Sequence, residues 1–85
     1  MAELIHVCET EVRDAGGVTY RAEVHGEGRD DGTWVGWIEF RPASGGEPAR
    51  RTGQETSQPN RDALAYWASG LEDVYLDGAL HRAAG

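Results

Sequence analysis

The fold of this chain is decided by residues 18–25, which read VTYRAEVH. Apolar residues stand at the even positions of this stretch, and polar or charged residues stand at the odd positions. An alternation with a period of two is typical of an antiparallel strand that has one face on a core and the other in water. The stretch therefore predicts a half-buried strand, and its neighbours in sequence are expected to supply the sheet and its cover.

Strands are predicted on both sides of this stretch. Residues 4–13 precede it across a turn with two adjacent glycines, which supply the backbone freedom of a tight hairpin. Residues 33–41 follow a polar loop and are apolar on both faces at their start, as expected of a central strand. Gly36 lies between two tryptophans there, which indicates either a bulge or the close approach of another part of the chain.

The C-terminal third predicts one long helix. Between Leu64 and Tyr75 apolar residues recur with a helical period, and their phase continues across Gly70. We therefore expect a single helix of about 20 residues within positions 58–82. Whether the segment around Arg50–Arg51 forms a fourth strand stays open, although residues 49–56 are compatible with a polar edge strand.

These elements together predict an α+β fold in a single domain over residues 1–85. An antiparallel sheet of three or four strands occupies about residues 4–56, and one long C-terminal helix packs on one of its faces. The start of the chain lacks the features of a signal peptide, and no stretch is long and apolar enough to span a membrane. A cytoplasmic protein is the expectation.

The charge balance disfavours several classes of partner. Fifteen acidic residues against eight basic ones give a net charge of −7, which repels nucleic acids and anionic membrane surfaces. A local basic patch could still bind a nucleic acid despite the negative net charge, and the residues that could form one are Arg41, Arg50, Arg51 and Arg61. We expect no nucleic-acid or membrane partner.

The titratable residues do not form a motif with a known chemistry. Cys8 is the single cysteine, which excludes a disulfide within the chain and a zinc site made of cysteines, and predicts a small buried side chain. His6 shares a strand face with Cys8, but two ligands do not make a metal site. Nucleophile elbows, phosphate-binding loops and zinc-protease spacings do not occur. We therefore expect a protein that is not an enzyme and that has no catalytic residue, metal or cofactor.

Two surfaces are candidates for binding a partner. Helical geometry places Tyr66, Leu76 and Leu80 away from the apolar stripe, either as ordinary exposed residues or as a contact surface. Trp37 points to the sheet face opposite the helix, which a chain of this length leaves partly bare. The sequence thus favours a non-catalytic protein-binding or self-associating module, with these four residues as its candidate contacts.

Two family resemblances accompany this interpretation. Residues 31–40 (DGTWVGWIEF), residues 52–56 (TGQET) and the following helix resemble the HicB-type antitoxin domain. That resemblance implies an antitoxin whose acidic surface neutralises a basic toxin partner. Residues 55–60 (ETSQPN) and 66–68 (YWA) are also similar to a small bacterial domain family without an assigned role, and we favour this second resemblance.

Overall fold

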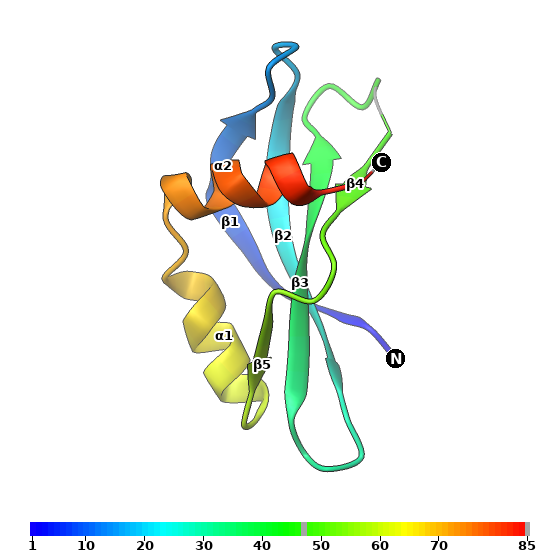
Figure 1. The fold of residues 1–85 in the computed structure, drawn as a ribbon, viewed down its shortest axis with the longest axis vertical. Helices are drawn as coiled ribbons and strands as arrows, with labels where there is room; N and C mark the ends of the chain where they lie inside the picture. The colour runs from blue at the N-terminus through cyan, green and yellow to red at the C-terminus, as the bar shows by residue number, and fades with distance from the viewer. Residues whose placement is uncertain (47, 85) are drawn as a thin grey trace.

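The computed structural model describes residues 1–46 and 48–84, which form a layer of strands and a layer of helices (Figure 1). The strands are β1 (Glu3–Arg13), β2 (Thr19–Gly28), β3 (Trp34–Pro42), β4 (Arg50–Arg51) and β5 (Thr56–Gln58). The helices are α1 (Arg61–Ser69) and α2 (Asp73–Arg82). An α+β fold built on an antiparallel sheet, as the sequence predicted, is confirmed.

The sheet is a meander of three long strands with two short strands on one edge. The strand order is β1-β2-β3-β4, all pairs are antiparallel, and β5 also pairs with β3. β4 lies opposite Glu39 and Phe40, whereas β5 lies opposite the first three residues of β3. The segment around Arg50–Arg51 is therefore a strand, and the residues after it return to the same edge of β3.

The core lies between the sheet and the helices, on the face that the even positions of β2 predicted. Tyr20, Ala22 and Val24 are buried there, and Tyr20 meets Phe40 of β3 edge to face. Cys8 also belongs to this cluster, and its burial raises the pKa of the thiol, so the predicted small buried role of this cysteine is confirmed. Trp34 and Trp67 pack against the same cluster and are partly exposed.

The prediction of one continuous helix was wrong, because the chain leaves the helical conformation at Gly70. Gly70 caps the end of α1, and α2 begins only after Glu72, whose backbone is extended. In Figure 1, α2 runs in a different direction from α1 and ends beside β4, where Ala84 bridges to Arg51. Across the described residues neither helix has the length and apolar character needed to cross a bilayer.

The break changes which residues of the C-terminal third are buried. Leu76 and Leu80, predicted on the outer surface, are only 1% and 3% exposed, whereas Val74 of the predicted apolar stripe is exposed. A straight 20-residue helix would be about 30 Å long and would present one stripe. Two shorter helices instead lay two independent apolar faces on the sheet, so the phase counted from Leu64 does not apply to α2.

Two side chains from the segments that follow β3, Glu55 and Arg50, attach α2 through hydrogen bonds. The Glu55 carboxylate accepts hydrogen bonds from the hydroxyl of Tyr75 and from Nη2 of Arg82, each 2.5 Å long. Burial by itself would raise the pKa of Glu55, but these hydrogen bonds and the charge of Arg82 outweigh it and lower the pKa. Burial and the contact with Glu55 raise the pKa of Tyr75 to about 12. At the C-terminal end of the helix, Arg50 Nη2 also donates to the carbonyl oxygens of Leu80 and Ala83 at 3.0 Å.

Candidate functional site

The sheet face opposite the helices, called the open face below, is where polar side chains gather. Strand pairing places residues in rows across β1, β2 and β3, because residues opposite each other share a face. One row joins Leu4, His25 and Trp37, and the next joins Val7, Glu23, Glu39 and Arg51. No helix of the described chain packs on this side of the sheet.

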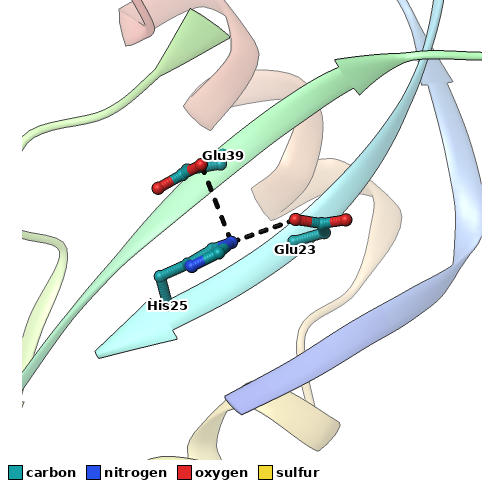
Figure 2. Close-up of side chains that lie close together, drawn as sticks. All are labelled: Glu23, His25 and Glu39. Carbon is teal, nitrogen blue, oxygen red and sulfur yellow. Dashed lines mark hydrogen bonds and ion pairs between the residues drawn. The ribbon is translucent and has the colours of Figure 1, made fainter. Parts of the chain in front are cut away.

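A cluster of four side chains, Glu23, His25, Glu39 and Arg41, occupies the centre of the open face, and Figure 2 shows the first three of them. His25 Nε2 lies 3.0 Å from Glu23 Oε1 and 3.7 Å from Glu39 Oε1. Arg41 donates to the same two oxygens, from Nε to Glu23 at 3.0 Å and from Nη2 to Glu39 at 3.1 Å. Two carboxylates from neighbouring strands thus converge on one imidazole and one guanidinium group.

The electrostatics of the cluster favour the charged form of the Glu23 carboxylate. Burial alone would raise the pKa of Glu23, but hydrogen bonds from His25 and Arg41 and the charge of Arg41 outweigh burial and lower it. The hydrogen bond to Glu23 and its negative charge raise the pKa of Arg41 in turn. Because these two groups support each other's ionised form, the cluster is a connected ionic network rather than a set of independent surface charges.

Trp37 lies on the open face, as predicted, but its indole ring is covered rather than available to a partner. The residue is only 7% exposed. The Arg51 guanidinium carbon stands 4.6 Å from the ring centroid, and the His25 ring stacks beside it with centroids 6.4 Å apart. The indole Nε1 donates to Glu39 Oε2 at 3.1 Å. Trp37 therefore holds the cluster in position, and its expected role as an exposed contact needs correction.

The exposed apolar side chains of the open face come from β1 instead. Leu4 and Val7 are 48% and 41% exposed, at the ends of the two rows that contain His25 and Glu23. A shallow hollow of about 340 Å³ lies at the other side of the face, with Trp37, Val35 and Arg51 in its wall. The open face thus combines two exposed aliphatic residues, a rigid ionic centre and a concave margin.

The outer surface of the helices differs from the predicted one. Tyr66 is 83% exposed, as expected, but Leu76 and Leu80 are in the core, so the predicted surface of three residues does not exist. The helices instead expose Val74 and several carboxylates. These acidic residues are Asp62, Glu72, Asp73 and Asp77.

Charge is distributed unevenly between the two faces. Among the residues that pair across the strands, four glutamates and four arginines lie on the open face, and their formal charges cancel. These residues are Glu11, Glu23, Glu27 and Glu39, with Arg13, Arg21, Arg41 and Arg51. The net charge of −7 therefore resides on the rest of the protein. The open face thus combines positive and negative side chains whose charges cancel, although the molecule as a whole is acidic.

The four arginines considered as a basic patch are engaged in separate contacts. Arg41 binds two glutamates, Arg51 covers the indole of Trp37, and Arg50 binds the end of α2. Arg61, at the start of α1, donates to Glu3 from Nε at 3.0 Å and from Nη2 at 2.7 Å. Only Arg41 and Arg51 share a face, where glutamates surround them.

Sequence reasoning did not identify the cluster of Glu23, His25, Glu39 and Arg41. The alternation in β2 placed Glu23 and His25 on one face, and that in β3 did the same for Trp37 and Glu39. The missing information was the register between the strands. The loop after Gly28 fixes it by pairing Gly28 with Trp34, which brings Glu23 opposite Glu39 and His25 opposite Trp37.

The ligand atoms of Glu23, His25 and Glu39 all lie within 4.8 Å of one another, which is a spacing that a metal ion can bridge. His6 and Cys8 do not add to this group, because Cys8 is in the core and His6 pairs with Val24 on the helix-facing side.

Comparisons of the chain with protein-family models, with curated proteins and with solved structures found no match.

Proposed function

We propose that this protein is a non-catalytic module that self-associates through the open face of its sheet. The observation that carries the proposal is the neutral charge of that face on a molecule of net charge −7. Two copies that approach through their acidic surfaces repel each other, whereas two open faces, each with balanced positive and negative side chains, do not. The open face is thus the surface on which a second copy meets the least electrostatic resistance.

The side chains of this face support the same proposal. Leu4 and Val7 offer apolar area at the rim, and burying such side chains is the main favourable term in association. The central glutamates, His25 and Trp37 already hold each other through hydrogen bonds and stacking. A preorganised surface loses less side-chain entropy on binding than a flexible one.

Sedimentation velocity across micromolar concentrations tests self-association directly. We expect a concentration-dependent dimer for the wild type and a monomer for Val7→Glu, which places a charge on the open face. Val74→Glu is the matched control, because it makes the same chemical change at an exposed valine of α2. A wild-type protein that stays monomeric over the whole range, or equal loss of the dimer in both variants, would contradict the proposal.

An acidic antitoxin is a second candidate function, favoured by the helical layer. Tyr66 and Val74 are exposed on helices that also carry Asp62, Asp73 and Asp77. Such a surface complements a basic protein, as the HicB-type resemblance implies. A short basic reading frame beside the gene would favour this candidate. Its complex should weaken with added salt and in Asp73→Asn with Asp77→Asn, which removes two acidic charges from this surface, but not in Val7→Glu.

A further inference from the structure

The cluster at the centre of the open face has the composition of a metal site as well as that of an ionic network. Glu23 and His25 stand two residues apart on β2, and Glu39 comes from β3 (Figure 2). We propose that these three side chains bind a divalent transition-metal ion, with Zn²⁺ as the representative ion. This inference goes beyond the proposed self-association and does not depend on it.

The geometry requires only small movements for such binding. Zinc holds imidazole nitrogen and carboxylate oxygen at about 2.0–2.1 Å, so neighbouring ligands of a tetrahedral site lie about 3.3 Å apart. The distances from His25 Nε2 to the Oε1 atoms of Glu23 and Glu39 are 3.0 and 3.7 Å, on either side of that value. The third pair, between the two carboxylates, lies within 4.8 Å and closes by side-chain rotation.

The surroundings of the three ligands are those that metal sites commonly have. Metal ligands are usually oriented by outer hydrogen bonds and packing. The indole Nε1 of Trp37 donates to Glu39 Oε2, which leaves Oε1 directed toward His25. The ring of Trp37 also stacks on the His25 imidazole at an interplanar angle of 17° and fixes the orientation of that ring. Trp37 is thus a positioning residue for the proposed site.

The ligand set selects among ions. One imidazole with two carboxylates suits zinc and its transition-metal neighbours, whereas Mg²⁺ and Ca²⁺ prefer six or more oxygen ligands. Three protein ligands complete a tetrahedral site when a water molecule takes the fourth position. We therefore expect Zn²⁺ to bind far more tightly than Mg²⁺ or Ca²⁺.

Arg41 is the built-in competitor for the metal ion. Its guanidinium donates to the same two Oε1 atoms that would ligate zinc, and its side chain is half-exposed. A dication that enters the cluster therefore displaces Arg41 toward solvent and takes over its role of balancing two carboxylates. This relationship makes a directional prediction: removing Arg41 strengthens zinc binding, although it removes the native ion pairs.

Isothermal titration of the full chain with ZnCl₂ tests the site. We expect one Zn²⁺ per chain, at least about tenfold weaker binding in His25→Gln and Glu39→Gln, and tighter binding in Arg41→Gln. His81→Gln is the matched control, because His81 is exposed on α2 and its contact is with the Asp77 carbonyl. Circular dichroism of each variant verifies folding, and shifts of the His25 ring resonances on adding Zn²⁺ to the wild type locate the ion without any substitution.

The outcomes are distinct. A wild type that does not bind Zn²⁺, equal losses in His25→Gln and His81→Gln, or unchanged affinity in Arg41→Gln would each overturn the proposed site. Sedimentation of the same samples with and without Zn²⁺ separates this result from self-association. One zinc ion per chain in a monomer supports the metal site while contradicting the dimer, and a dimer that does not bind zinc does the reverse.

Discussion

Gly26 of β2 and Gly36 of β3 lie directly opposite each other across the two strands, and Leu64 of α1 fills the space above them. A Cβ atom on Gly36 would stand 2.7 Å from Leu64 Cδ1 and 3.3 Å from Thr56 Cγ2. The first turn of α1 therefore packs onto bare backbone. This contact is the close approach that Gly36 indicated in the sequence, and no register shift interrupts the pairing of β2 with β3.

Substitution of Gly36 by alanine should destabilise the protein. Overpacking of a core destabilises a protein by about 1–3 kcal/mol. Alanine also lowers the conformational entropy of the unfolded chain relative to glycine, which stabilises the folded protein by about 0.4–1 kcal/mol. We expect a net loss of about 1–2 kcal/mol in the free energy of unfolding, measured in urea. Gly53→Ala is the control, because the space around Gly53 is open. Equal stability of the two variants would show that Leu64 does not rest on Gly36.

Replacing Gly70 by alanine should leave the two helices separate. Alanine favours the helix by about 1 kcal/mol over glycine. A continuous helix would move Leu76 and Leu80 out of the core, at a cost of about 1.5–3 kcal/mol for each side chain. The burial of Leu76 and Leu80 therefore outweighs the helix propensity of alanine at position 70. Non-helical Cα chemical shifts at residues 70–72 of Gly70→Ala are the expected result, and uninterrupted helical shifts from 61 to 82 would refute it.

The start of α1 depends on one side-chain cap. Asn60 Oδ1 accepts a hydrogen bond from the Ala63 amide at 2.8 Å, and the Asn60 backbone is extended, as is typical of an N-cap residue. Asn60→Ala should lower the midpoint of thermal unfolding and cost about 1 kcal/mol. Asn60→Asp retains an acceptor at the same place and should stay close to the wild type. An alanine variant as stable as the aspartate variant would argue against the cap.

Glu55 should contribute stability that depends on pH. Its pKa is lowered in the folded protein, so its contribution is fully present above the unfolded pKa of about 4.3 and disappears as the pH falls through the folded value. Glu55→Gln should therefore cost about 1–2 kcal/mol at pH 7. The difference from the wild type should shrink progressively below about pH 4.5.

Urea unfolding of the wild type and Glu55→Gln at several pH values measures this effect. Glu72→Gln serves as the control, because Glu72 is exposed and its side chain makes no capping hydrogen bond at the start of α2. A cost for Glu55→Gln that stays constant from pH 7 to pH 3 would mean that the contacts with Tyr75 and Arg82 do not depend on the carboxylate charge.

The residue patterns in the sequence were sufficient to predict the sheet but not the helices. The period of two in residues 18–25 identified both the buried and the polar face of β2, because side chains of a strand alternate regardless of what covers them. The same kind of pattern failed between Leu64 and Tyr75. A helical phase is meaningful only while the helix is unbroken, and Gly70 allows a break without requiring one.

Local alternation and composition were enough to predict the antiparallel strands, the acidic charge and the placement of Trp37 on the face away from the helices. The burial of Leu76 and Leu80 and the meeting of Glu39 with Glu23 and His25 became visible only in the folded chain. Both outcomes depend on contacts between segments distant in the chain: the docking of α2 on the sheet and the register of β2 with β3. Burial and strand register are set by the free energy of the whole packed molecule, which no single stretch of residues carries.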